Sequence, residues 1–146
     1  MNNNFTILST KILKPYIAQQ FVDNDFNIIE HNFITIEPQN VEGLDIILQQ
    51  QNNNYIFTSK NAVKCFADYI EKNNVKVDKK TTIFSLSGET QNTLIDAGFK
   101  PTLVAENAEN LATEIISKAN IKNVVFFCGN KRRPNLLNIF LGLKIV

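Results

Sequence analysis

The segment that decides the fold lies near the middle of the chain and reads Tyr55-Ile-Phe-Thr-Ser-Lys-Asn-Ala-Val63. Its first three residues are apolar and suit a buried strand. The polar junction that follows leads into a helical pattern, with Val63, Phe66 and Ile70 on one face. This order of strand, polar junction and helix recurs along the chain, which is typical of an α/β protein with a mainly parallel sheet.

The same pattern extends on both sides of this segment. Strands are expected at residues 5–8, 33–36, 55–57, 82–85, 102–104 and 124–127. Helices are expected to start at Pro15, near Leu44 and near Ala108, and to end at Gly98, a residue type favoured just after a helix. In the first helix, Ile17, Ala18, Phe21 and Val22 have the spacing of a core-facing stripe. The strand at 124–127 is strongly apolar, which predicts a central position in the sheet.

The two ends of the chain do not look self-contained. The first strand-helix-strand unit is too small to bury its own faces. After a last helix starting at Pro134, a final strand begins at residues 143–146 and the sequence stops. We therefore expect the polypeptide to be truncated, with the rest of a first domain downstream. A stop codon directly after Val146 in the reading frame would count against this expectation.

Composition excludes several classes of protein. The chain has 146 residues, of which 44% are hydrophobic and 20% charged, as in an ordinary globular protein. The formal net charge of +1 gives no global field toward nucleic acid or membrane. No apolar run approaches the ~20 residues that span a bilayer, and nothing at the N-terminus resembles a targeting signal. Cys65 and Cys128 form no CxxC pair, which fits a reducing compartment. The expected location is the cytoplasm.

Three strand-to-helix junctions are candidates for ligand binding. They are Thr58 to Asn61, Ser87 to Thr90, and Cys128 to Arg133. In a parallel sheet all three would lie at the carboxyl edge, where such folds bind ligands. A helix N-terminus there offers backbone N–H groups and a partial positive charge, which suit a carboxylate or phosphate.

A plainer interpretation stands beside this one. Serine and threonine before a helix are most often caps worth ~1 kcal/mol, without a further role. The basic run Lys131-Arg-Arg133 is equally compatible with a solvated surface. Three such junctions at one edge, one of them with a basic cluster, favour binding. Cys128 has no evident histidine partner and fits a small buried residue at a strand end better than a nucleophile.

Several kinds of catalytic site are disfavoured by the residues. His31 is the single histidine, and it lies in an extended segment where a structural role is expected. Zinc sites and serine-type triads are therefore disfavoured. The sequence has no GxGxxG and no GxxxxGK[ST] motif, which argues against dinucleotide and Walker-type nucleotide binding. Any chemistry is expected to need neither metal nor cofactor.

The junctions resemble the signatures of the uroporphyrinogen-III synthase family. Tyr55 to Val63 is similar to the family's Phe-Thr-Ser-x-x-Ala-Val motif, and Ile83 to Gly98 to its Gly-x-x-Thr…Leu…Gly segment. Phe126 to Arg133 is similar to its third strand and basic loop, preceded by a fitting stretch at Glu106 to Leu111. Ser9-Thr-Lys11 lies where the family often has Thr-Arg. The sequence departs from the pattern twice: Ser87 replaces a usual glycine, with Gly88 one place later, and Asn61 falls where a basic residue can occur.

The resemblance implies a fold of two α/β domains joined by a two-stranded connector. Residues 1–37 would begin domain one and include the first connector strand, residues 38–142 would form domain two, and residues 143–146 would start the return strand. The chain would then cover about the first 60% of a family member, without a tyrosine that the family places after the return strand. On this basis the 146-residue chain is expected to be inactive alone.

The resemblance also implies a function, a lyase of haem biosynthesis. Such an enzyme closes hydroxymethylbilane, a linear tetrapyrrole with eight carboxylates, with loss of water and inversion of the last pyrrole ring. It would act as a monomer, without cofactor, nucleic acid or membrane. Thr90 is the candidate catalytic residue. The expected substrate-binding residues are Thr58, Ser59, Asn61, Ser87, Thr90, Gly129, Asn130, Lys131 and Arg132.

Two alternatives remain. A flavodoxin-like or receiver-type module would act by binding alone, but a receiver needs an acidic pocket at strand ends that here carry Ser, Thr and Lys. A nucleotide-sugar or anion-binding Rossmann-like domain could use the same three helix N-termini. Tight nucleotide binding that tetrapyrrole does not affect would favour it.

Overall fold

The computed structural model describes residues 5–51, 53–118, 121 and 124–130. The chain divides into two compact units, Met1–Gln39 and Asn40–Val146. The predicted division into residues 1–37, 38–142 and 143–146 stays a prediction. The helix expected from Pro134 and the strand expected at 143–146 lie outside the described residues.

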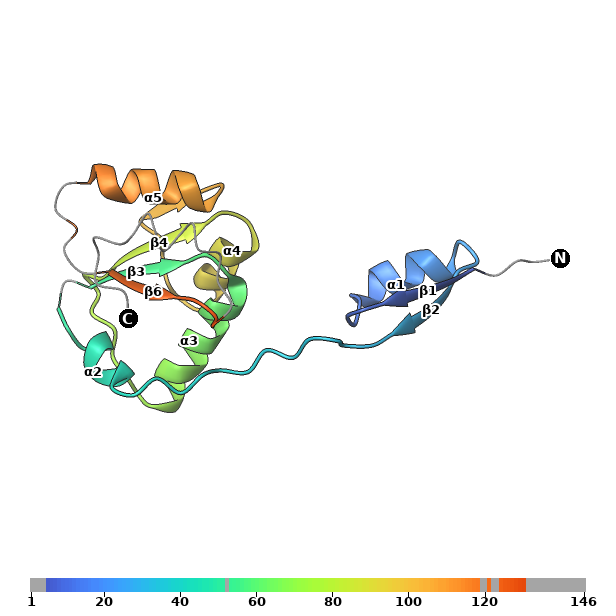
Figure 1. Cartoon of the computed structure of the whole chain (residues 1–146), viewed down its shortest axis with the longest axis horizontal. Coiled ribbons are helices and arrows are strands. Elements are labelled where there is room, and N and C mark those ends of the chain that lie inside the picture. The colour runs from blue at the N-terminus through green and yellow to red at the C-terminus, as the bar shows by residue number, and fades with distance from the viewer. Residues whose placement is uncertain (1–4, 52, 119–120, 122–123, 131–146) are drawn as a thin grey trace. The chain divides into compact units, whose positions relative to one another are not determined.

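The first unit is a single strand-helix-strand element. Strand β1 (Thr6–Ser9) pairs in parallel with β2 (Asn27–Glu30), and helix α1 (Pro15–Val22) connects them (Figure 1). Pro15 occupies the first turn of α1, where a missing N–H leaves no hydrogen bond unmade. The loop after β1 is held by the last residue of β2, because a carboxylate oxygen of Glu30 accepts a hydrogen bond from the N–H of Leu13 at 2.6 Å.

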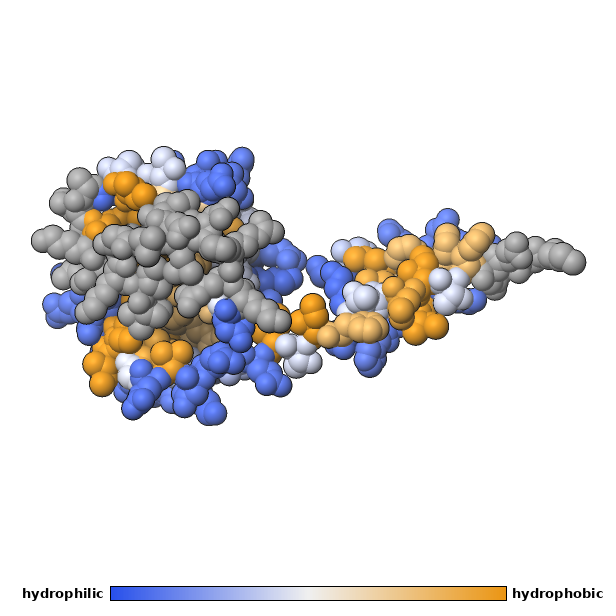
Figure 2. Space-filling view, in the orientation of Figure 1, coloured by the Kyte–Doolittle hydropathy of each residue, from blue (hydrophilic) through white to orange (hydrophobic). Residues whose placement is uncertain are grey.

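No side chain between residues 5 and 39 is buried. Ile17, Ala18 and Phe21 are half-buried as expected of the helix stripe, but Val22 is 55% exposed, so its predicted place in a core is wrong. One helix over one face of two strands is too small an arrangement to enclose a core. The absence of buried side chains among residues 5–39 agrees with the prediction from the size of the unit. Figure 2 shows hydrophobic side chains over much of the visible surface of this unit.

The strand expected at residues 33–36 is not formed, and β2 lies at Asn27–Glu30 instead. Residues 27–30 have a partner, since β1 runs beside them in register from Thr6 to Ser9. Beyond them, the N–H of Phe33 bonds Thr10 O at 3.2 Å, and Ile34 is 80% exposed. Apolar spacing alone did not make a strand here, because a strand also needs a neighbour for its backbone groups.

The second unit is a parallel sheet between helices. Its strands are β3 (Asn54–Phe57), β4 (Thr82–Leu86), β5 (Leu103–Ala105) and β6 (Val124–Phe127). Its helices are α2 (Leu44–Leu48), α3 (Lys60–Lys72), α4 (Glu89–Asp96) and α5 (Ala108–Ser117). The strand order is β5-β4-β3-β6, and all pairings are parallel. The α/β class and the parallel sheet predicted from the sequence are confirmed.

Alternate strand residues build a core on each face of the sheet. Tyr55, Phe57 and Ile83 pack with α3 and α4 on one face, together with Val125. Ile56 and Phe84 pack with α5 on the other face, together with Val124 and Phe126. Figure 1 shows α5 and the pair α3 and α4 on opposite sides of the strands.

The predicted central position of β6 stays a prediction, because residues 131–146 lie outside the part of the chain that the structure describes. Among the described strands β6 pairs with β3 alone and stands at the end of the order. Its apolar run reflects cover on both faces, because Val125 belongs to the α3–α4 core and Val124 and Phe126 to the α5 core. The continuous apolar run of β6 therefore reports burial of both of its faces.

Candidate functional site

The carboxyl edge of the second sheet gathers the predicted junctions. Since β4, β3 and β6 are neighbours and parallel, the segments that follow them leave the sheet at one edge. Thr58 to Asn61, Ser87 to Thr90, and Gly129 with Asn130 therefore lie side by side along that edge. Lys131 and Arg132 lie outside the described residues, so their placement at the edge stays a prediction.

The strand order places a reversal within this edge. From β3 the chain proceeds outward to β4 and β5, and it then returns to the other side of β3 as β6. Helices α3 and α4 cover one face and α5 the other, so the connecting helices change face where the strand order reverses. Ligands of open α/β sheets bind at such a switch point, beyond the carboxyl ends of the strands. Here it lies between Thr58 with Ser59 on one side and Gly129 with Asn130 on the other.

Stacked aromatic rings underlie the switch point. Phe57 and Phe127 are the last residues of β3 and β6 and stand opposite each other in the parallel register. Their ring centroids are 4.6 Å apart with planes inclined by 5°. Phe66 of α3 packs on both rings, at 5.2 and 4.9 Å. This packing fixes the spacing of the two strand ends, and with it the spacing of the polar residues that follow.

The β3–α3 junction is built around a serine cap. Ser59 has extended backbone angles, and its Oγ accepts from the N–H of Asn61 at 3.2 Å. Thr58, Ser59 and Asn61 are all half-buried. Ser59 therefore caps α3, and its part in binding stays a prediction. The cap therefore occupies one of the backbone N–H donors that the start of α3 presents.

The β4–α4 junction turns on glycine. Gly88 precedes α4 with φ 75° and ψ −132°, and it has no side chain to cap the helix. Ser87 is exposed, and its N–H donates to Ala105 O at 2.9 Å, which ties the junction to the end of β5. Thr90 is the second residue of α4 and is 7% exposed. Thr90 is therefore packed into the base of the edge, whereas Ser87 lies on its surface.

A fourth junction reaches the same edge and was not among the predicted sites. β5 neighbours β4 and leads into α5, whose cap is Asn107. The Oδ1 of Asn107 accepts from the N–H of Asn110 at 2.9 Å. The signal was present, because asparagine is a preferred cap before an apolar helical pattern. The first turn of α5 carries Glu109, so this end of the edge is acidic.

An ion pair between two junctions was also missed. Nζ of Lys60, the first residue of α3, lies 2.6 Å from Oε2 of Glu89, the first residue of α4. Glu89 is well placed, because a carboxylate at a helix start gains ~0.3–1 kcal/mol from the helix dipole. Lys60 has the opposite sign and loses a comparable amount there. Lys64 one turn further on adds a like-charge repulsion of ~0.2–0.5 kcal/mol.

Other candidate groups do not join this site. In the part of the chain that the structure describes, no cluster of three or more His, Cys, Asp and Glu residues could hold a metal ion. Cys128 is half-buried, whereas the sequence predicted a buried residue. His31 is exposed in the first unit, where its ring meets that of Phe33 edge-on with the ring centroids 5.2 Å apart. Burial raises the pKa of Tyr55 above 10.0, but its hydroxyl donates to Leu48 O at 3.2 Å and so fastens α2 to β3.

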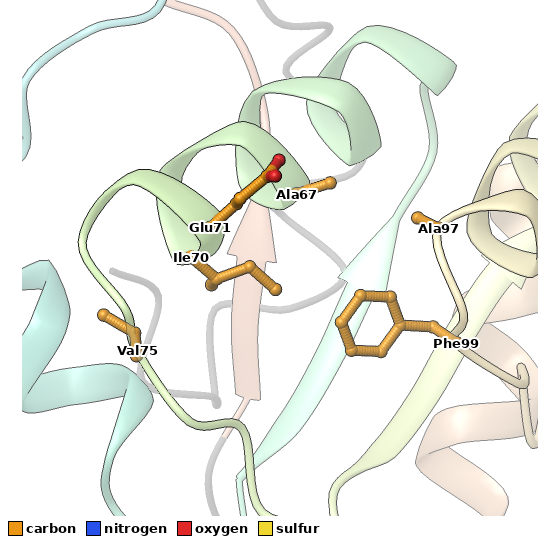
Figure 3. Close-up of a pocket in the computed structure, with 6 residues that line it drawn as sticks. All are labelled: Ala67, Ile70, Glu71, Val75, Ala97 and Phe99. Atoms are coloured by element: carbon orange, nitrogen blue, oxygen red, sulfur yellow. The ribbon is translucent and has the colours of Figure 1, made fainter.

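A shallow pocket of about 370 Å³ lies on the face of the sheet that α3 and α4 cover (Figure 3). It sits between the last turns of α3 and the end of α4, which run away from the carboxyl edge. None of the predicted site residues lines it. Ala67, Ile70, Glu71, Val75, Ala97 and Phe99 do. Because it is apolar apart from Glu71 and contains no residue of the junctions, it does not belong to the candidate site.

The fold and this edge define a class of protein: an α/β protein with several adjacent helix N-termini at one edge of its sheet, a geometry that suits an anion. The family model for uroporphyrinogen-III synthase HemD matches residues 16–144. The chain belongs to this family, which confirms the resemblance of its junctions. No helix among the described residues is long and apolar enough to cross a membrane.

Solved structures agree in fold. The chain matches uroporphyrinogen III synthase of the extremely thermophilic bacterium Thermus thermophilus with TM-scores of 0.73 for a mutant and 0.62 for the wild type, at 12% identity in both cases. Another structure of the Thermus thermophilus enzyme gives 0.56. The first match covers 97% of this chain and 59% of that one, so the chain spans about three-fifths of the neighbour's length. No curated protein sequence matches significantly.

Proposed function

We propose that this chain forms part of a uroporphyrinogen-III synthase that closes hydroxymethylbilane with loss of water and inversion of the last pyrrole ring. Family membership over residues 16–144 supports the assignment. The observation that carries the site is the row of adjacent helix N-termini at the carboxyl edge, with the switch point between β3 and β6. We further propose that the protein is a cytoplasmic monomer without a nucleic-acid partner.

The substrate suits this edge by its charge. Hydroxymethylbilane carries eight carboxylates, and each helix N-terminus favours one anion through its N–H groups and dipole. Several such sites on one rigid sheet bind several carboxylates at once, and this fixes the conformation of a flexible chain. In our proposal the second unit contributes Thr58, Ser59, Asn61, Ser87, Thr90, Gly129 and Asn130, with Lys131 and Arg132 adding positive charge.

The chemical task in this proposal is mainly positional. The unaided bilane closes without inversion, so the protein must hold its two ends in the geometry that leads through a spiro intermediate. Fixed orientation of reacting groups can supply a large part of a barrier reduction without a strong acid or base. Thr90 is the candidate for direct contact with the reacting end, because it lies at the start of α4 and is 7% exposed at the base of the edge.

The test is a coupled assay that separates porphyrin isomers. Hydroxymethylbilane is generated in situ, and the oxidised products are resolved for the 146-residue chain and for the full protein that contains it. We expect an excess of isomer III from the full protein and isomer I alone from the 146-residue chain. A folded full protein that yields isomer I alone would refute the synthase assignment and leave an anion-binding α/β domain.

A further inference from the structure

The ion pair between Lys60 and Glu89 bridges the starts of two helices at the proposed site. Each residue is the first of its helix, and the helices follow the paired strands β3 and β4. The side chains are 44% and 68% exposed, respectively. A ligand in solution can therefore reach both charged groups, and an exposed pair of this kind exchanges partners at little cost.

The position of Lys60 is not explained by the stability of α3. The first turn of that helix holds no acidic residue, and the dipole of the helix opposes a cation at its start. Departures from such local rules are expected at functional sites, where another requirement outweighs them. Here the requirement met by a cation is attraction of an anion, because the ammonium adds to the positive ends of α3 and α4 at one place.

We propose that Lys60 is a further substrate-binding residue, and that Glu89 holds its ammonium in place until a carboxylate of the ligand takes over. The exchange moves no proton and breaks no covalent bond. It rests on the proposed function, because the incoming group is a carboxylate of the tetrapyrrole. Lys60 would then act beside Ser59 at the start of α3.

Glu89 gives this exchange a selective effect. A ligand with a single carboxylate must displace a carboxylate that is tethered beside Lys60 and therefore present at high effective concentration. A ligand with several carboxylates gains contacts at the neighbouring helix N-termini in the same event, and these contacts offset the displacement. Glu89 thus favours polycarboxylates over the small organic acids that share their chemistry.

Binding of uroporphyrin I, an octacarboxylate, to the 146-residue chain tests the proposal by fluorescence titration. Lys60→Met should weaken binding about five-fold, the size of one exposed ion pair. The matched control Lys64→Met removes the same charge one turn further along α3 and should change the Kd less than about two-fold. Glu89→Gln should tighten binding by about five-fold, whereas Glu109→Gln, which removes an acidic group from the first turn of α5, should have a small effect.

The outcomes separate this inference from the proposed function. Equal losses in Lys60→Met and Lys64→Met, with unchanged circular dichroism, would show a general field and overturn a specific contact. Equal gains in Glu89→Gln and Glu109→Gln would overturn the role of Glu89 as a competitor. In the double variant Lys60→Met/Glu89→Gln, the gain from Glu89→Gln should largely disappear. Wild-type chain that fails to bind uroporphyrin I would overturn the proposed binding edge itself, and this inference with it.

Discussion

Gly88 offers a sharp test of how the β4–α4 junction is made. The residue has φ 75° and ψ −132°, a combination that side-chain-bearing L-residues rarely adopt. A Cβ atom built at Gly88 meets no atom within 4 Å. Replacement by alanine therefore adds no steric clash with neighbours, and its cost comes from the backbone conformation alone. That separation makes the magnitude calculable.

Gly88→Ala should lower the free energy of unfolding by about 1–3 kcal/mol, the cost of holding a non-glycine residue in this region. Gly129→Ala is the matched control, because Gly129 also has open space around it and its φ is not positive. At such a position alanine restricts the unfolded chain and should be neutral or stabilise by up to about 1 kcal/mol. Gly98, with φ 83° after α4, should give an intermediate loss of about 1–2 kcal/mol.

Urea unfolding followed by far-ultraviolet circular dichroism measures these differences. The midpoint should fall for Gly88→Ala at an unchanged slope, which reports lost stability without a change in the surface exposed on unfolding. The refuting result is equal stability of the Gly88 and Gly129 variants. It would mean that the junction relaxes to an ordinary conformation at no cost, and that Gly88 does not set the start of α4.

Three further predictions concern side chains of the second unit. Thr90→Ala should reduce isomer III formation by the full protein and cost ~1 kcal/mol of stability through the loss of its nearly buried methyl group. Thr93→Ala, one turn later in α4, should leave the isomer ratio unchanged, and equal activities of the two variants would remove Thr90 from the site. Ser85→Ala should raise the free energy of unfolding by about 1 kcal/mol, because the Ser85 Oγ is buried without a hydrogen-bond partner among the described residues; a lower urea midpoint would contradict this. Tyr55→Phe should cost ~1 kcal/mol at neutral pH through the lost bond to Leu48 O. Since burial raises the pKa of Tyr55, its contribution is complete below pH 10.0 and is lost as the pH rises through the folded-state pKa, so the two proteins should converge in alkaline urea titrations.

The order of strands and helices in the second unit was predictable because local signals agree with each other there. The residues from Tyr55 to Phe57 are apolar, Ser59 caps the next helix, and Val63 with Phe66 forms its buried stripe. Periodicity, capping and burial all indicate the same boundaries at this point, and the structure shows them within a residue or two. Gly98 likewise ends α4 with the positive φ that its residue type predicts.

The first unit was less predictable because its stability is not local. Phe33 to Ile36 is more apolar than the true strand Asn27–Glu30, so apolar character alone favours the wrong stretch. The segment that pairs with β1 is the one that the chain brings beside it after α1. Its position follows from the length of α1 and from the turn at Asp25, whose φ is 60°. Strand assignment here needs a tertiary partner that composition does not reveal.

The candidate site divides in the same way. Each junction can be located from its own residues, but the chemistry of the edge depends on which junctions become neighbours. Placing β3 between β4 and β6 brings Thr58 and Ser59 opposite Gly129 and Asn130 at the switch point. The same order puts Lys60 against Glu89, two residues 29 positions apart in sequence. A lysine at the start of a helix is unfavourable in isolation. In our proposal it becomes an anion-binding group because the strand order supplies a second helix start and a displaceable carboxylate beside it.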